Sequence, residues 1–254
     1  MDNKKFTVFL DIDNTLMSGG KIPERNIEAI KKVREKGSLV FINTARSYAF
    51  IPEILKDDAL FDGYVAGIGT DLRLHNKQIS SHILTRDELK FIAKHFLECG
   101  REFAFEGEDD MIWINPQEDR NATHLLSAPE EFDTIYKDFR ISKLYVRGQM
   151  TKEENEIFGK DYILYQHGHY AEFVTKGYGK AVGMKKMTAH LRIPEENCIA
   201  MGDSANDTDM LLAAGISVAM GNATPEIKEI CDYISCDAND GGVAEALEKF
   251  ILKV

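Results

Sequence analysis

The sequence predicts an α/β fold: a core of parallel strands covered by helices, with an α+β domain inserted into it. In the first and last thirds of the chain, short apolar runs alternate with amphipathic helical patterns, which indicates a parallel sheet. Between them, strand-like runs follow one another across short turns, which indicates an antiparallel sheet. We therefore expect a discontinuous core domain at residues 1–79 and 176–254, and an inserted α+β domain at residues 80–175.

The first third begins with a buried strand. Phe6–Leu10 is a short apolar run that ends at acidic residues, as buried parallel strands often do. Pro23 then opens a helical pattern, and Gly37 ends it. Apolar runs at residues 39–42 and 64–66 predict the second and third strands.

The middle segment combines helices with hairpins. Thr85 and Glu88 form a capping-box pattern for a helix that Gly100 ends, and a second capping box begins at Thr151. Pro129 is expected to open a further helix. The expected strands are residues 103–105, 111–114, 143–146, 162–165 and 172–174. This mixture of elements is typical of an α+β domain.

The last third returns to the alternation of helix and strand. Expected helices are residues 180–191, 209–214 and 243–251, with one more opened by Pro225. Expected strands are residues 198–201 and 217–219, with a short one at Tyr233. These elements complete the core that the first third begins.

Composition and charge exclude several classes of protein. The chain has 254 residues, and 42 acidic against 31 basic side chains give a net charge of −11. This excess argues against nucleic acids and anionic membrane surfaces as partners. No apolar run approaches a membrane-spanning length, and the run before Asp11 is too short for a signal peptide. Four cysteines without a C-x-x-C pair indicate a reducing compartment, so we expect a cytoplasmic protein. The sequence does not indicate the oligomeric state.

Polar residues follow three of the predicted core strands. Asp11 and Asp13 come after the first strand, Thr44 after the second, and the run Asp203–Asp207 after the strand at residues 198–201. Ligands of open parallel sheets bind beyond the carboxyl ends of the strands. Residues two apart in an extended chain also leave it on the same side, as Asp11 and Asp13 do. We therefore expect these groups to converge at one edge of the sheet.

The types of side chain in this group suit phosphoryl transfer. Clustered carboxylates repel one another unless a cation lies between them, and their hard oxygens are ligands that Mg²⁺ prefers. One carboxylate can attack phosphorus to give an aspartyl-phosphate, and a second can act as acid and base. Thr44 offers a hydroxyl to a phosphoryl oxygen, while Lys180 adds a positive charge at a predicted helix start. These groups supply the positioning and charge neutralisation that phosphoryl transfer requires.

In this order, the motifs resemble those of the haloacid dehalogenase superfamily phosphatases, and in particular the Cof-type branch, type IIB. The matching stretches are Asp11-Ile12-Asp13-Asn14-Thr15, Thr44, Lys180, Gly202-Asp203-Ser204-Ala205-Asn206-Asp207 and Gly215–Ala223. The resemblance implies a Rossmann-like, three-layer parallel-sheet core. It also implies that the inserted α+β domain is a cap of type C2, placed between the second and third motifs.

The resemblance also implies roles for seven residues. Asp11 is the nucleophile, and Asp13 is the acid and base. The residues that hold the phosphoryl group are Thr44, Lys180 and Asn206. The residues that hold Mg²⁺ are Asp11, Asp13, Asp203 and Asp207.

The sequence also supports expectations about individual residues outside these seven. Lys176 is a rival for the third motif, but Lys180 is preferred because an apolar helix pattern follows it directly. Asn14 stands where glycine is commonest, and asparagine tolerates a left-handed turn. Glu172 and His169 are candidate cap residues that face the cleft.

The predicted function is a Mg²⁺-dependent phosphatase, a phosphoric monoester hydrolase. Its partner would be a small phosphorylated metabolite, with sugar phosphates favoured, and the reaction would pass through an aspartyl-phosphate. Two alternatives stay open: a sugar phosphomutase of the same superfamily, which returns the phosphoryl group to substrate, and a non-catalytic scaffold that binds phosphate compounds. Asp13 argues against the scaffold, because a long-lived aspartyl-phosphate needs no adjacent base.

Overall fold

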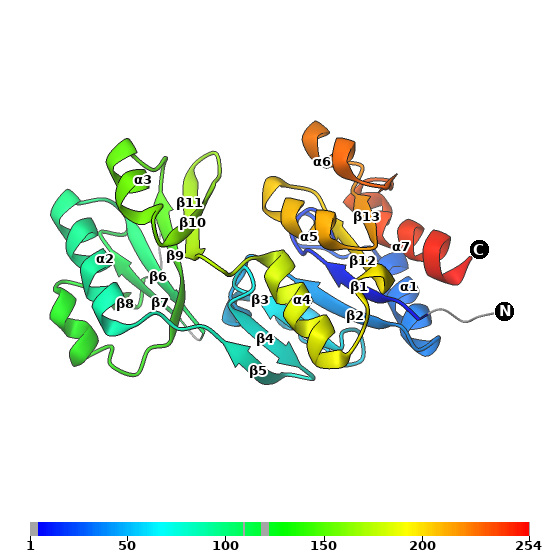
Figure 1. Cartoon of the computed structure of the whole chain (residues 1–254), viewed down its shortest axis with the longest axis horizontal. Coiled ribbons are helices and arrows are strands. Elements are labelled where there is room, and N and C mark those ends of the chain that lie inside the picture. The colour runs from blue at the N-terminus through cyan, green and yellow to red at the C-terminus, as the bar shows by residue number, and fades with distance from the viewer. Residues whose placement is uncertain (1–4, 109, 118–121, 254) are drawn as a thin grey trace.

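In the computed structural model the chain forms two lobes, each built on its own sheet (Figure 1). The structure describes residues 5–108, 110–117 and 122–253. We call the lobe with the eight-stranded sheet the core and the lobe with the six-stranded sheet the cap. The α/β fold class with an inserted α+β cap is therefore confirmed. The predicted domain boundaries stay a prediction; the last strand of the core sheet on the N-terminal side runs to Ser81.

The core sheet has the strand order β14-β13-β12-β1-β2-β3-β4-β5, so the two ends of the chain meet at its centre, where β1 pairs with both β2 and β12. All pairs from β14 to β3 are parallel, whereas β4 and β5 add an antiparallel hairpin at one edge. The strands are β1 (Thr7–Leu10), β2 (Leu39–Asn43), β3 (Gly63–Ala66), β4 (Asp71–Leu74), β5 (Lys77–Ser81), β12 (Cys198–Gly202), β13 (Ile216–Ala219) and β14 (Tyr233–Ile234).

Helices cover both faces of this sheet and give the core three layers. Val8 and Leu10 of β1 pack with two helices, α1 and α7, on one face. Phe9 points to the other face, where it stacks on Phe41 with ring centroids 5.4 Å apart. Three further helices cover that second face. The helices are α1 (Glu24–Glu35), α4 (Lys180–Leu191), α5 (Thr208–Ala213), α6 (Pro225–Ile230) and α7 (Gly242–Leu247). Burial on both faces explains why these strands read as continuous apolar runs.

The cap packs two helices against one face of its sheet, whose strand order is β10-β11-β9-β6-β7-β8. Its strands are β6 (Phe103–Gly107), β7 (Met111–Ile114), β8 (His124–Leu125), β9 (Ile141–Arg147), β10 (Tyr162–Gln166) and β11 (Tyr170–Thr175), and its helices are α2 (Arg86–Cys99) and α3 (Lys152–Phe158). Phe96 of α2 stacks on Phe103 with centroids 3.9 Å apart. Because side chains alternate along strands, the opposite face is left to meet the core.

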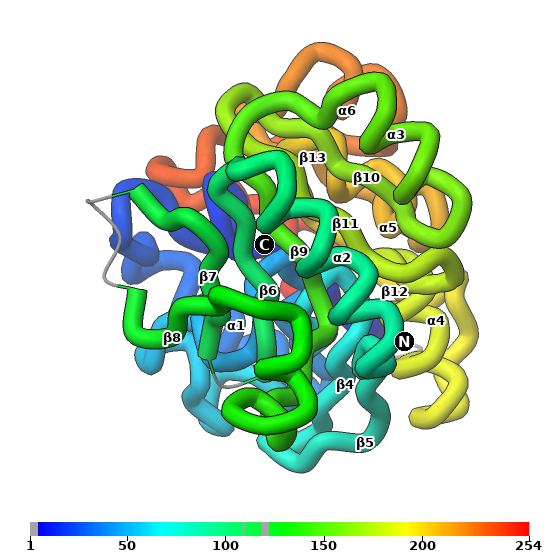
Figure 2. Tube along the Cα trace, turned by 90° about the vertical axis from the view of Figure 1, so that its left-hand side faces the viewer, coloured from blue at the N-terminus to red at the C-terminus, as the bar shows by residue number. Residues whose placement is uncertain are grey.

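Two chain segments join the lobes, one between β5 and α2 and the other between β11 and α4 (Figure 1). Figure 2 looks from the cap side, with β6, β9 and α2 in front of the core. His82 in the first segment stacks on Tyr178 in the second, with centroids 4.3 Å apart. Its Nε2 atom also lies 2.8 Å from Thr175 Oγ1. The two connections are therefore held side by side.

Local sequence signals set the helix ends as expected. Thr85 and Glu88 make a complete capping box, as do Thr151 and Glu154. Gly100 ends α2 with φ +70°, in the left-handed region that glycine adopts without strain. In the described part of the chain, no helix combines the length and apolar character needed to cross a bilayer.

Several elements differ from the predictions, among them the two-residue strand β8, which was not predicted. The hairpin of β4 and β5 was not predicted, because its turn uses His75 and Asn76 at φ +45° and +59° instead of a glycine pair. The helix expected at Pro129 is a short 3₁₀ helix, Pro129–Asp133. The final helix ends at Leu247, and a π-helical turn (Glu248–Leu252) continues it. The pattern of polar and apolar residues does not determine which backbone hydrogen bonds form, and so it did not identify these local structures.

Candidate active site

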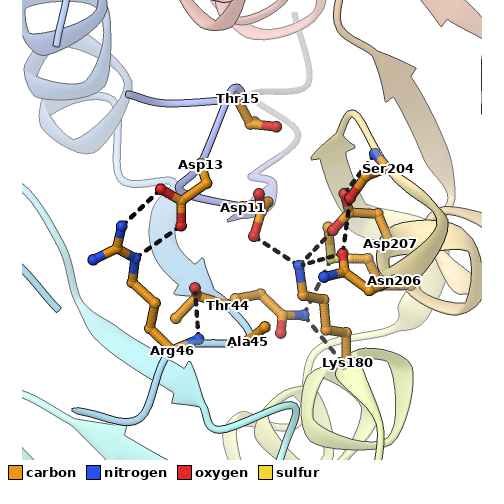
Figure 3. A network of polar contacts seen from close by, with 12 residues as sticks. Asp11, Asp13, Thr15, Thr44, Ala45, Arg46, Lys180, Ser204, Asn206 and Asp207 are labelled. Carbon is orange, nitrogen blue, oxygen red and sulfur yellow. Dashed lines mark hydrogen bonds and ion pairs between the residues drawn. The ribbon is translucent and has the colours of Figure 1, made fainter. Parts of the chain in front are cut away.

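The predicted polar groups lie together at the carboxyl ends of the core strands (Figure 3). Asp11 follows β1 directly, and its backbone N–H donates to the carbonyl oxygen of Met201 in β12, 3.1 Å away. A cavity of about 600 Å³ opens over these ends between core and cap. Predicted site residues that line it are Asp11, Asp13, Thr44, Asp203 and Asn206. The structure therefore brings three distant parts of the sequence to one cavity.

Lys180 occupies the floor of the cluster. It is the first residue of α4 and is fully buried, and its Nζ atom lies 2.6 Å from both Asp11 Oδ1 and Asp207 Oδ1. Asn206 Oδ1 is 3.3 Å from the same nitrogen. Burial lowers the pKa of Lys180, but the two carboxylates outweigh it and raise that pKa overall. The rival Lys176 is exposed.

A close backbone approach fixes the start of α4. Gly69, in the loop after β3, has φ +82°, and a Cβ atom there would lie 2.2 Å from the carbonyl oxygen of Gly179. Glycine at position 69 therefore lets the loop pack directly on the residue before Lys180. Asp209 Oδ2 accepts a hydrogen bond from the N–H of Ala181 at 3.1 Å. These two contacts hold Lys180 at the cluster.

Three buried carboxylates form the group that can hold a cation. Ligand oxygens of Asp11, Asp203 and Asp207 all lie within 4.8 Å of one another. Burial raises the pKa of Asp11 to about 8 despite the opposing effect of Lys180. Burial and the neighbouring Asp207 raise the pKa of Asp203 to about 6. This charge is therefore poorly compensated by protein groups alone, and the all-oxygen donor set suits a hard divalent cation.

Asp207 has a structural role within this cluster. Its Oδ2 atom accepts hydrogen bonds from the backbone N–H groups of Asp203 and Ser204, at 3.0 and 3.1 Å. A Cβ atom on Gly202 would lie 2.5 Å from the Asp207 carboxyl carbon, so glycine makes room for it. Both oxygens of Asp207 thus have protein partners, Lys180 being the other. Asp207 shapes the loop that presents Asp203, and its coordination of a metal stays a prediction.

Asp13 lies at the mouth of the cavity and pairs with Arg46. Two guanidinium nitrogens of Arg46, Nε and Nη2, each lie 2.8 Å from a different oxygen of the half-exposed Asp13 carboxylate. Asn14 adopts φ +57°, the left-handed turn expected for asparagine there. Thr44 Oγ1 accepts the backbone N–H of Arg46 at 3.2 Å, which leaves the Thr44 hydroxyl proton for another acceptor. Arg46 was missed, although its position two residues after Thr44 is a usable signal.

The cap reaches into the same cavity through a buried lysine. Lys143 Nζ lies 2.9 Å from the carbonyl oxygen of Ala45 in the core. It also contacts two cap carboxylates, Glu106 at 3.0 Å and Glu172 at 2.5 Å. Glu106 in turn accepts hydrogen bonds from the backbone N–H and the hydroxyl of Ser47. The cap thus binds Ala45 and Ser47 of the core directly.

The expectations for individual cap residues are met in part. Glu172 lines the cavity, as predicted, but His169 does not, and His167 lines it instead. The ring of His167 stacks on Tyr170 with centroids 4.4 Å apart. The alternation along β9 and β11 places Lys143, Tyr170 and Glu172 on the sheet face toward the core. That alternation is the signal that would have identified Lys143.

Glu172 predicts a measurable pH dependence of stability. Burial raises its pKa, but Lys143 and His167 lower it overall from 4.5 to about 2. The ionised form therefore stabilises the fold above pH 4.5, and this contribution is lost as the pH falls toward 2. We expect Glu172→Gln to lower the unfolding free energy by about 3 kcal/mol at neutral pH. The difference should shrink below pH 4.5.

Urea unfolding of wild type and Glu172→Gln from acid to neutral pH measures this effect. Glu98→Gln is the matched control, since Glu98 is exposed on α2, and it should change stability little at any pH. If the unfolding free energies of wild type and Glu172→Gln differed by the same amount at every pH, the lowered pKa of Glu172 would be contradicted.

Comparison with known proteins agrees with this geometry. Residues 8–247 match the family of haloacid dehalogenase-like hydrolases. The chain is 28% identical to the "putative phosphatase YkrA" of Bacillus subtilis (strain 168), covering 98% of both chains. It is 26% identical to the 5-amino-6-(5-phospho-D-ribitylamino)uracil phosphatase YcsE of the same organism, covering 96% of this chain and 95% of that one.

A solved structure gives the same result for the whole fold. A sugar phosphatase described as haloacid dehalogenase subclass IIB superposes with a TM-score of 0.83 and 26% identity, covering 97% of this chain and 99% of the other. The two proteins therefore have both the core and the cap in common. The family match spans both lobes and the structural match is nearly complete, so the chain belongs to the haloacid dehalogenase-like hydrolases, in their Cof-type, subclass IIB branch of phosphatases.

Proposed function

We propose that this phosphatase is Mg²⁺-dependent and hydrolyses small phosphorylated metabolites, sugar phosphates above all, through an aspartyl-phosphate on Asp11. The observation that carries the proposal is the buried contact of 2.6 Å between Lys180 Nζ and Asp11 Oδ1 at the floor of the cavity. Lys180 fixes one oxygen of Asp11, and the other is the proposed nucleophile. The cavity of about 600 Å³ lies within the range of about 300–1,000 Å³ usual for small-molecule sites.

The acidic cluster is the proposed Mg²⁺ site. The carboxylates of Asp11 and Asp203 and the backbone carbonyl of Asp13 would hold the ion, with Asp207 fixing the loop. Thr15 Oγ1, 3.3 Å from Asp203 Oδ1, orients that carboxylate. When bound, Mg²⁺ neutralises charge on the cluster and on the phosphoryl oxygens.

The proposed first step transfers the phosphoryl group to the protein. With Asp13 protonated at the start of the step, the free oxygen of Asp11 attacks phosphorus, the bond to the leaving oxygen breaks, and Asp13 gives that oxygen its proton. Thr44, Lys180 and Asn206 would hold the phosphoryl oxygens. At least one Arg46 contact to Asp13 must give way in this step, since both Asp13 oxygens are paired with Arg46.

The proposed second step returns the protein to its starting state. Asp13, now a carboxylate, takes a proton from water as the water oxygen attacks phosphorus. The bond to Asp11 breaks, and inorganic phosphate leaves. The buried position of Asp11, 6% exposed, keeps bulk water from the acyl phosphate except along this route.

The names of two relatives support a sugar-like leaving group. One is a phosphatase of a phosphorylated ribitylamino compound, and the other is a sugar phosphatase. Both names describe a phosphate ester carried by a polyhydroxylated carbon chain. We propose the same substrate class here, and Glu172 and His167 on the cap wall would lie over the leaving group.

Metal dependence is the first test of this proposal. Phosphate release from a panel of sugar phosphates should require Mg²⁺ and stop when a chelator is added. Mg²⁺ should also raise the melting temperature, because the unfolded chain lacks the site. Asp203→Asn should abolish this shift and lower kcat by about 10²-fold or more.

The same assay separates the competing functions. Net release of inorganic phosphate from excess substrate excludes the phosphomutase, which would return the phosphoryl group to substrate. Asp138→Asn, at an exposed position of the cap, is the control for the substitution and should retain the Mg²⁺ response. Equal phosphate release with and without chelator would refute the proposed metal dependence.

A further inference from the structure

The cap wall of the cavity contains a lysine whose hydrogen-bonding capacity is fully used. An ammonium group has three N–H donors. Lys143 Nζ has three acceptors within 3.0 Å: the Ala45 carbonyl oxygen, Glu106 Oε2 and Glu172 Oε1. The side chain of Lys143 is 3% exposed. Lys143 therefore has no donor left for an anionic group on a substrate.

Of the two carboxylates beside Lys143, Glu172 keeps spare acceptor capacity, whereas Glu106 Oε1 already accepts two hydrogen bonds from Ser47. Each carboxylate oxygen can accept about two hydrogen bonds. Glu172 gives Oε1 to Lys143, and its Oε2 atom lies 3.3 Å from His167 Nε2. That His167 nitrogen is buried, and in the described part of the chain no contact to it, that of Glu172 included, has the geometry of a hydrogen bond. Glu106 and Glu172 both line the cavity, so the wall offers two negative charges against one positive charge.

The other lysine and arginine groups near the cavity lie on the core side and pair with the catalytic aspartates. Arg46 pairs with Asp13 through two nitrogens, and its third, Nη1, donates to the carbonyl oxygen of Phe50 at 3.1 Å. Lys180 contacts Asp11, Asn206 and Asp207. Arg46 and Lys180 thus belong to the core side of the cavity, where the phosphoryl group is proposed to bind, and Lys143 is the lysine that the cap contributes to the described lining.

We infer that the wall of Lys143, Glu106 and Glu172 selects leaving groups that donate hydrogen bonds, such as polyols, and rejects leaving groups that carry a carboxylate. Glu172 and His167 are the specificity-determining residues, because both line the cavity and Glu172 Oε2 accepts no hydrogen bond from Lys143. This inference rests on the proposed phosphatase function and names the substrate class for it. A carboxylate at this wall would meet the like charges of Glu106 and Glu172, while the donors of Lys143 are already used.

Matched substrate pairs test the inference. Glycerol 3-phosphate and 3-phosphoglycerate differ by a terminal alcohol against a carboxylate, as do glucitol 6-phosphate and 6-phosphogluconate. For wild type we expect kcat/KM to favour the alcohol by about tenfold or more in at least one pair. Glu172→Gln should reduce that ratio by about tenfold, because it removes the repelling charge. A ratio measured within one preparation cancels any difference in the fraction of folded protein.

The outcomes distinguish this inference from the proposed function. Glu98→Gln, the exposed control on α2, should leave every ratio at the wild-type value. Wild type that releases phosphate from p-nitrophenyl phosphate but uses carboxylate and alcohol substrates equally would overturn the inference and leave the phosphatase standing. Release from neither p-nitrophenyl phosphate nor the paired substrates would overturn both. An unchanged ratio in Glu172→Gln would remove Glu172 from the selection.

Discussion

Asp11→Asn is expected to lower kcat by about four to six orders of magnitude, the largest effect of any single substitution in this protein. An amide oxygen is a poor nucleophile, and Asp11 is the only proposed attacking group. Its carboxylate lies at the floor of the cavity, 6% exposed, with Lys180 on one oxygen. Steady-state phosphate release measures the loss. Mass spectrometry of acid-quenched wild type should find a phosphoryl group on the peptide that contains Asp11.

A control and a second measurement make this result specific. Asp138→Asn makes the same chemical change at an exposed cap position and should retain the wild-type rate. Asp11→Asn should still bind substrate, because Thr44 and Asn206 are unchanged. Equal rates for Asp11→Asn and wild type would refute the covalent mechanism.

Lys180→Met is expected to damage both folding and catalysis. Removing the ammonium leaves Asp11 and Asp207 facing each other without the cation that lies 2.6 Å from each. Breaking a buried ion pair in this way costs about 3–5 kcal/mol of stability. Loss of the charge at the phosphoryl site should lower kcat by about 10²- to 10³-fold. Urea unfolding and phosphate release measure the two effects on the same protein.

The chain provides a matched control for this lysine. Lys176 lies four residues earlier in the segment joining β11 to α4 and is exposed, so Lys176→Met should change neither property. Adding Asp207→Asn to Lys180→Met should recover part of the stability, since one unpaired charge is removed, without recovering activity. Wild-type stability in Lys180→Met would show that the buried pairs contribute nothing to the fold.

The core was predictable because its strands are buried on both faces. Apolar runs that end at Asp11, Thr44 and Asp203 mark both the strands and the sheet edge where their polar residues meet. The start of α4 at Lys180 was also recovered. By contrast, β5 carries polar residues on an edge strand and turns without glycine, so no periodicity distinguishes it from a loop.

The contacts between core and cap were not predictable from local patterns. Lys143 meets Ala45, and Glu106 meets Ser47, only because the two connecting segments set the cap over the core at one particular angle. No signal within a strand encodes that angle. The pairing of Arg46 with Asp13 has a different origin, since both residues lie in neighbouring loops at the edge of the core sheet. Strand alternation limits which cap residues face the core but does not select their partners.

The loop after β2 concentrates four functions in consecutive residues. Thr44 is a proposed phosphoryl ligand, Ala45 accepts from Lys143, Arg46 holds Asp13, and Ser47 binds Glu106. A leaving group too large for the cavity would hold the two lobes apart and break both cap contacts to this loop. The same loop orients Asp13 and the phosphoryl group. A leaving group that fits the cap poorly should therefore react slowly as well as bind weakly. Discrimination among substrates should accordingly appear in kcat, as an induced fit transmitted through a single loop.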